Sequence, residues 1–256
     1  LDNVLINNHV QISFGGGIYG RNSNPTLNNV RVLNNTTYHM GAGIYFYQSS
    51  PVLNNVIIKD NSAFGGGAGG GIAAGNSTLI FNNCLVANNS ADDGVGGGIE
   101  LFYGSSAELN NVTVANNYAG LYNGGGIHCE HNTNIVLTNS ILHSNQPKQI
   151  EFTSTSNAGP SSANISYSNI DGGESGITLL NSGEVNWLEG NIDLDPLFDD
   201  DYTLQPSSPC IDAGHPDLDG DGSTYETDPD DQDVDGTRMD LGVFAFIGPD
   251  TIPPTL

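Results

Sequence analysis

A glycine cluster recurs along the first half of the chain at an almost constant interval. The steps between clusters are 26, 28, 27 and 28 residues, and each cluster ends in isoleucine: GGGI at 15–18, GAGI at 41–44, GGGI at 69–72, GGGI at 96–99 and GGGI at 124–127. An LDNV or LNNV motif keeps the same interval from residue 1 onward, as does the column Asn35, Asn61, Asn89, Asn117 and Asn145. A fixed interval of this length indicates repeating units that stack on one another.

The composition of these units favours strands over helices. They are rich in Gly, Asn, Val and Ile, with short alternating runs such as residues 30–32 and 44–46 in place of the apolar spacing of helical repeats. Three short strands and three turns that close within one interval have the dimensions of one coil of a parallel β-helix. The sequence therefore predicts an all-β fold in which about five to six coils, stacked at about 4.8 Å, span residues 1–145.

The repeat register predicts which side chains meet in the stack. The isoleucines that end the glycine clusters form one expected inward column, and a second reads Ile6, Val32, Ile58, Val86, Val114 and Leu142. The glycines are expected at corners, where the backbone adopts positive φ or approaches its neighbour closely. A ladder of mutually bonded side-chain amides is predicted along the column Asn3, Asn29, Asn55, Asn83, Asn111 and Asn139. Replacing Asn83 by leucine is therefore expected to be costly.

With these repeats the chain resembles the right-handed parallel β-helix surface proteins of bacteria, including those with polymorphic outer-membrane-protein repeats. Their GG-A/G-I motif alternates with a Phe- or Leu-led xxN motif, as it does here over residues 1–145. DPLFDDDYTLQPSSPCIDAG at 195–214 and DVDGTRMDLGVFAF at 233–246 look like the C-terminal coil and closing strand of secreted members of this group. The resemblance implies secretion and display at a cell surface. It implies no single reaction, because the fold supports lyases, hydrolases, adhesins and passive stalks.

The pattern weakens after the repeats. Less regular coils are expected over residues 146–192, so that the β-helix occupies residues 1–192. Residues 193–247 are predicted to be a C-terminal coil and cap that contains an acidic loop, and residues 248–256 to begin a linker. No cap is visible before Leu1. The first coil is therefore expected to be covered by a missing segment or by a second copy, in a homo-oligomer or an end-to-end stack.

The charge balance excludes two classes of partner. Five Lys and Arg residues stand against 29 Asp and Glu residues, and 16 of these acids lie between Asp193 and Asp240. So few cations cannot neutralise the phosphates of nucleic acids or of an anionic membrane surface. No run of about 18 apolar residues occurs, so membrane insertion is not expected. The three cysteines show no CxxC spacing and indicate neither a disulfide framework nor a zinc site.

Aromatic side chains mark one predicted strand face. Tyr19, Tyr45, Tyr47 and Phe102 occupy outward columns next to carboxylates. Exposed aromatic rings beside acids commonly bind sugars, since the ring faces offer flat apolar area. The alternative is that aromatic residues suit strands and shield the sheet.

The same face contains the candidates for catalysis. In YNGGGIHCEH at 122–131, strand alternation directs His128 and Glu130 outward and Cys129 inward. Glu100 and Glu130 lie on adjacent coils, where their carboxyl groups could approach the separation of about 5–9 Å that glycoside hydrolases use. A lyase would need a strong base, but the lysines and arginines are not clustered. No residue is assigned as catalytic, and an enzyme is not the favoured interpretation.

The acidic region contains the spacing of a calcium loop. Residues 217–228 read DLDGDGSTYETD, with acids at positions 1, 3, 5 and 12 and glycine at position 6. Alternate oxygens can then converge on one hard cation while glycine permits the sharp turn. Aspartate at position 12 resembles dockerin-type loops, and Asp231 or Asp233 could add a ligand; the alternative is a solvated acidic loop. The expected calcium ligands are Asp217, Asp219, Asp221, the Ser223 carbonyl and Asp228.

Together these patterns predict a secreted, extracellular module for surface display, adhesion or structure, with calcium as cofactor and a glycan or cell-surface component as partner. The alternative is a polysaccharide-binding or polysaccharide-degrading domain that uses the aromatic and carboxylate face. A walled groove with convergent acids would favour that alternative. A flat convex ribbon would favour the module.

Overall fold

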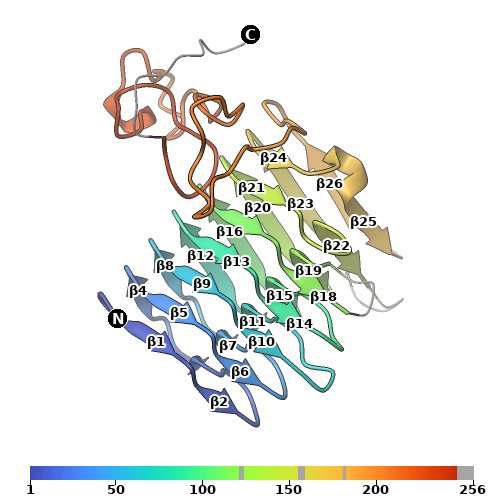
Figure 1. Ribbon diagram of the computed structural model, residues 1–256. Helices are drawn as coiled ribbons and strands as arrows, with labels where there is room; N and C mark the ends of the chain where they lie inside the picture. The colour runs from blue at the N-terminus through green and yellow to red at the C-terminus, as the bar shows by residue number, and fades with distance from the viewer. Residues whose placement is uncertain (121–123, 155–158, 181–182, 247–256) are drawn as a thin grey trace.

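The computed structural model describes residues 1–120, 124–154, 159–180 and 183–246 (Figure 1). Through the first five coils the chain passes through four sheets in a constant order, and the strands pair in parallel with their equivalents in the neighbouring coils. The predicted all-β parallel coil is confirmed. Each of these coils contains four strands rather than three, because a two-residue strand forms at an expected turn.

The first and second sheets come from the beginning of each coil. The first sheet consists of β1 (Leu5–Asn7), β5 (Arg31–Leu33), β9 (Ile57–Lys59), β13 (Leu85–Ala87), β17 (Thr113–Ala115), β21 (Ile141–His143) and β24 (Asn169–Ile170). The second sheet consists of β2 (Val10–Gln11), β6 (Thr36–Thr37), β10 (Ser62–Ala63), β14 (Ser90–Ala91) and β18 (Tyr118–Ala119).

The third and fourth sheets complete each coil. The third sheet consists of β3 (Ile18–Arg21), β7 (Ile44–Tyr47), β11 (Ile72–Gly75), β15 (Ile99–Phe102), β19 (Ile127–Glu130), β22 (Ile150–Thr153) and β25 (Ile177–Leu180). The fourth sheet consists of β4 (Thr26–Asn28), β8 (Val52–Asn54), β12 (Thr78–Asn82), β16 (Ser106–Asn110), β20 (Asn134–Thr138), β23 (Ser161–Ser166) and β26 (Gly183–Trp187).

Apolar side chains form continuous columns inside the coil. The isoleucines that end the glycine clusters lie opposite one another in the third sheet. Phe46, Phe81 and Phe152 are the bulkiest side chains of the fully buried core. The second column, in the first sheet, reads Ile6, Val32, Ile58, Val86, Val114 and Leu142. Both predicted inward columns are therefore confirmed.

The buried asparagine ladder runs through a different column from the predicted one. Asn89 shows its pattern: Nδ2 donates to Asn117 Oδ1 and to Ile58 O, both at 3.0 Å. Its Oδ1 accepts the Nδ2 of Asn61 at 2.9 Å. The members are buried at the corner between the first and second sheets: Asn35, Asn61, Asn89, Asn117 and Asn145. Every amide in this ladder is thus satisfied by the neighbouring coils and by the backbone.

The asparagines of the column that was predicted to form the ladder lie in turns instead. Its six members have φ between 51° and 55°, in the left-handed region. Asparagine adopts this conformation more readily than most residues because its short polar side chain bonds locally. Asn83 is exposed, so the predicted buried ladder at this position is wrong.

Glycine is needed in the clusters for two different reasons. Gly69, the first of its cluster, has φ +66°, where a side chain would be strained. Gly71, the third, lies so close to the next coil that a Cβ would meet Gly98 O at 2.5 Å. The same Cβ would lie 3.1 Å from Asn89 Nδ2, in the buried ladder. The clusters are therefore corners of the coil, as predicted.

Residues 193–246, called the C-terminal segment below, lie along the outer face of the first sheet (Figure 1). Tyr202 packs against Leu85, and Leu241 against Ile141. At the equivalent outward position of the first coil, Leu5 has no such cover and is 59% exposed. The segment predicted to close the end of the β-helix is thus a lateral cover, because apolar side chains on this outer face must also be buried.

The C-terminal segment contains little regular secondary structure. Its strand-like contacts are two isolated antiparallel bridges, Phe198 with Leu204 and Gln232 with Arg238. The described parts of the chain contain two short 3-10 turns, η1 (Gly173–Gly176) and η2 (Pro229–Asp231). In those parts, no helix has the length and apolar character needed to cross a membrane.

Candidate functional site

The outer face of the third sheet contains the candidate side chains of β15 and β19. Strand register aligns them in a column that reads Tyr19, Tyr45, Ala73, Glu100, His128 and Glu151. A neighbouring column on the same face reads Arg21, Tyr47, Gly75, Phe102, Glu130 and Thr153. Cys129 lies in the core, so the predicted alternation of this strand is confirmed.

This face is covered over much of its length. Tyr45 and Phe102 are only 7% and 6% exposed. Phe14 and Met40, from the connections that precede the third sheet, pack against this cluster. The prediction of an open aromatic ribbon is therefore wrong for these two rings, because the glycine-rich connections fold back over the strands.

Among the predicted ligand-binding residues, the accessible aromatic rings lie in the first two coils. Tyr19 is 53% exposed and stacks on Tyr45, with ring centroids 5.6 Å apart. Tyr47 is partly buried, and the Arg21 guanidinium lies 5.7 Å from its ring centroid. The predicted ligand-binding residues therefore form no continuous exposed surface.

Glu100 and His128 form a buried pair beneath the cover. His128 Nδ1 lies 2.7 Å from Glu100 Oε2, and Thr153 Oγ1 lies 3.1 Å from His128 Nε2. Burial raises the pKa of Glu100, although His128 lowers it in part. Burial lowers the pKa of His128, but the charge and hydrogen bond of Glu100 raise it overall. Both imidazole nitrogens are engaged, which holds the ring in one orientation.

Glu151 extends this column by one coil. It is buried, and its Oε1 has no hydrogen-bond partner in the described part of the chain. Burial raises the pKa of Glu151, while His128 and Lys148 lower it. Glu151 and Thr153 were not among the predicted site residues, although both follow from continuing the β19 register into the less regular coil.

Glu100 and Glu130, the two carboxylates predicted to act together, each pair with a histidine instead. Glu130 Oε1 lies 3.0 Å from His131 Nε2, whereas Glu100 is bound to His128. Glu130 is partly exposed and Glu100 is 1% exposed. A glycosidase needs both carboxyl groups beside the scissile bond, so this arrangement does not fit that chemistry.

The three cysteines are unsuited to nucleophilic chemistry. All are free and buried. Burial raises the pKa of Cys84 to about 12 and of Cys210 to about 11, and it also raises that of Cys129. Thiolates are therefore scarce near neutral pH, as expected for thiols that act as small apolar side chains.

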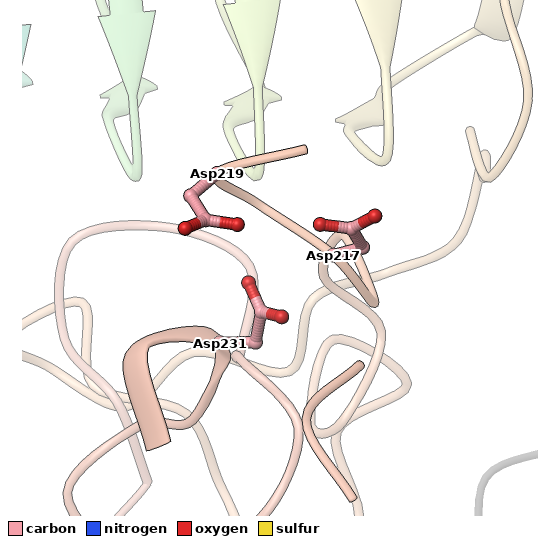
Figure 2. Close-up of side chains that lie close together, drawn as sticks. All are labelled: Asp217, Asp219 and Asp231. Carbon is pink, nitrogen blue, oxygen red and sulfur yellow. The ribbon is translucent and has the colours of Figure 1, made fainter. Parts of the chain in front are cut away.

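The acidic loop brings its carboxylates together in two overlapping groups. Asp217, Asp219 and Asp231 form one, in which an oxygen of each lies within 4.8 Å of the others (Figure 2). Asp219, Asp221 and Asp228 form the second. Four of the predicted ligand residues thus lie in these groups, together with Asp231 from the following acidic run.

Hydrogen bonds shape the loop around these groups. Asp217 accepts the N–H groups of Gly220 at 2.8 Å and Gly222 at 3.1 Å. Ser223, whose carbonyl was a predicted ligand, donates its N–H to Asp221 Oδ1 at 2.7 Å. The Asp221 N–H lowers the pKa of Asp219, but desolvation and the carboxylates around it raise it overall. The loop therefore concentrates negative charge.

A family model described as the right handed beta helix region matches residues 2–161. The chain belongs to the right-handed β-helix family. The match supports the right-handed coil that the resemblance implied. The matched range ends at the first residue of β23 (Ser161–Ser166). Comparison with curated proteins and with solved structures gave no match.

The right-handed β-helix also has a pocket that sequence reasoning missed. It has a volume of about 570 Å³ and lies between the corner asparagines and the C-terminal segment. Asn55, Asn83 and Asn111 line one side, and Phe244 and Asp233 belong to the other. Burial is the largest cause that raises the pKa of Asp233, to about 8. The repeated LNNV motif could have indicated the asparagine side, but no local pattern shows that the C-terminal segment folds against it.

Proposed function

We propose that this β-helix is an extracellular structural or adhesive module of a larger secreted or surface-displayed protein. One observation carries the proposal: the side chains best suited to catalysis, Glu100 and His128, are bound to each other and are 1% and 3% exposed. A catalytic acid and base must reach the substrate. This covered pair is instead suited to fastening neighbouring coils.

The outer face of the fourth sheet supports an adhesive role. Asn54 Nδ2 donates to Asn28 Oδ1 and Asn82 Nδ2 to Asn54 Oδ1, each at 2.9 Å. Asn110 Nδ2 continues the row by donating to Asn82 Oδ1 at 3.2 Å. Such a row presents amides at the strand spacing of about 4.8 Å. This regular polar surface is suited to contacts with a neutral glycan or another uncharged cell-surface polymer.

The first coil supports association with a further coil or a second copy. Leu5, Val10 and Ile12 are 59%, 72% and 82% exposed, and the strands of this coil form one edge of their sheets. Edge strands readily pair with additional strands. Sedimentation velocity over a range of concentrations tests this: end-to-end association raises the mean mass with concentration, and a concentration-independent monomer contradicts it.

The module and the enzyme are distinguished by a paired assay on a polysaccharide panel. The purified protein is tested for binding by sedimentation with insoluble polymers and for release of reducing or unsaturated ends. The module predicts binding without product and no change in Glu100→Gln. Product formation that is lost in Glu100→Gln would overturn the proposal. Antibody labelling and protease shaving of intact source cells test location, and a pool that is wholly protected inside the cells would contradict it.

A further inference from the structure

We propose that Asp217, Asp219 and Asp231 bind a calcium ion that ties the acidic loop to the turn η2 (Figure 2). Each residue offers an oxygen within 4.8 Å of the other two. Oxygens that bind one calcium ion at about 2.3–2.6 Å lie no more than about 5 Å apart. The spacing therefore allows one ion to contact all three carboxylates.

The state of Asp231 points to a ligand independently of the clustering. Its side chain is 0% exposed, and its Oδ2 has no hydrogen-bond partner among the described residues. Its Oδ1 accepts the N–H of Leu218, so that the carboxylate faces Asp217 and Asp219 (Figure 2). A buried carboxylate oxygen without a donor is unfavourable unless a proton or a cation neutralises it.

The described residues place no paired lysine or arginine at this group. In the described ranges, no lysine or arginine forms an ion pair with Asp217, Asp219 or Asp231. Three carboxylates held together without a counterion repel one another. A bound divalent ion removes this repulsion and also gives Asp231 Oδ2 a partner.

The donor chemistry favours calcium over other divalent ions. All three side chains offer carboxylate oxygen, whereas zinc sites are usually built with cysteine or histidine. Magnesium demands a near-ideal octahedron and usually keeps several waters, while calcium accepts six to eight oxygens in flexible geometry. Asp219 is exposed, so water can complete the coordination shell.

This ligand set differs from the one expected for a linear calcium loop. In a linear loop Asp228, at position 12, would close the shell. Here Asp228 lies in the other group, and its Oδ1 accepts the Asp230 N–H at 3.0 Å at the start of η2. Asp231 takes the closing position instead. The ion would therefore join two consecutive acidic runs of the C-terminal segment.

Calorimetric titration of chelator-treated protein with calcium chloride tests the site and its ligand set. We expect binding by the natural chain and at least about tenfold weaker binding by Asp231→Asn. Asparagine can still accept the Leu218 N–H, which limits the damage to the fold. The matched control is Asp230→Asn, because this exposed neighbour removes the same charge outside both groups. Its affinity should change by less than about threefold, since exposed charges are screened.

Thermal unfolding provides the second readout. Calcium should raise the melting temperature of the natural chain and of Asp230→Asn, but not of Asp231→Asn. If Asp231→Asn does not fold in chelator, the exposed Asp219→Asn variant takes its place. No binding by the natural chain overturns the site. Full binding by Asp231→Asn with loss in Asp228→Asn overturns the ligand set in favour of the linear loop. Retained binding by Asp219→Asn also overturns the site, as does magnesium bound more tightly than calcium.

Discussion

The coils of residues 1–192 and the C-terminal segment of residues 193–246 are stabilised in different ways. In the coils each strand pairs with the equivalent strand of at least one neighbouring coil, and interactions recur from coil to coil. In the C-terminal segment the backbone is held by short local bonds, such as the N–H of Asp221 to Asp219 and that of Ser223 to Asp221. A repeat gains stability from its neighbours, whereas a unique segment depends on the surface against which it packs.

The attachment of the C-terminal segment shows this dependence. Tyr202 donates its hydroxyl to Asn88 Oδ1 at 2.8 Å and accepts from Asn116 Nδ2 at 3.0 Å. It also lies beside Lys59, whose Nζ is 5.7 Å from the ring centroid. One side chain thus contacts three successive coils. The segment has no repeat of its own, so its conformation depends on packing against the repeating first sheet.

The largest expected effect is in the buried ladder. Asn89→Leu should lower the free energy of unfolding by roughly 3 kcal/mol or more, because it leaves several buried donors and acceptors unsatisfied. These include the backbone N–H of Asn61 and the carbonyl of Ile58. Urea unfolding monitored by circular dichroism measures the change. A loss below about 1 kcal/mol would contradict the role of the ladder.

Asn83→Gly is the control for the ladder prediction. Asn83 is exposed with φ 54°, a conformation that glycine adopts without strain. The free energy of unfolding should change by less than about 1 kcal/mol. Equal losses in Asn89→Leu and Asn83→Gly would show that the two asparagine columns are not distinguished by burial.

The next largest loss of stability is expected at one of two leucines that occupy equivalent positions in the first sheet. Leu85 is 3% exposed beneath the C-terminal segment, whereas Leu5 is 59% exposed. Leu85→Ala should cost about 2–3 kcal/mol, and Leu5→Ala should stay within about 0.5 kcal/mol. Chemical denaturation of both variants measures the difference. Similar values for the two would argue against lateral packing of the segment.

A smaller effect is expected at the attachment point. Tyr202→Phe keeps the ring against Leu85 but removes the hydroxyl that bonds to Asn88 and Asn116. The expected loss is about 1 kcal/mol, because the two bonds are partly buried. Limited proteolysis should also cut the C-terminal segment faster while the coils stay intact. Unchanged stability and cleavage would show that packing alone attaches the segment.

The smallest effect is a pH dependence that arises in the coils. The pKa values of Glu100 and His128 are both raised in the folded protein. Their contribution to stability is therefore complete below the unfolded values of 4.5 and 6.5, and it is lost as the pH rises through the raised values. Unfolding free energies measured between about pH 5 and 9 should fall with rising pH. Glu100→Gln should fall less steeply, because it removes both the raised carboxyl pKa and the main cause of the raised histidine pKa; an unchanged slope would contradict this assignment.

The coil could be predicted from the sequence because the repeat interval shows which residues of successive coils are equivalent. Once Gly69 and Gly96 are equivalent, the positions of the residues between them follow, and alternation along the strand sorts inward from outward side chains. The same rule placed Cys129 in the core. Choosing between the asparagine columns was harder, since a buried ladder and a left-handed turn both favour asparagine.

The candidate site was predicted only in part, since its surroundings come from outside the repeat. Alternation can show that Phe102 points away from the core, but not that it is buried in a cluster with Tyr45 and Ala73. The spacing of the acidic loop indicated Asp217 and Asp219 as partners. The sequence offered Asp231 or Asp233 as a further ligand, and the choice of Asp231 depends on how η2 returns to the loop, which no spacing rule describes.

By itself, the sequence determined the parallel coil, its inward columns and the corners occupied by glycine, because each of these is a nearest-neighbour property repeated along the chain. Only the tertiary structure decided that the C-terminal segment lies along the first sheet, that Glu100 and His128 are covered, and that Asp231 joins the acidic loop. These features rest on contacts that occur once. The bond from Asn111 Nδ2 to Asp240 O joins residues 129 positions apart, and that from the Val243 N–H to Thr113 Oγ1 joins residues 130 apart. No periodic pattern records such contacts, because they form only when the whole surface of the coil is already in place.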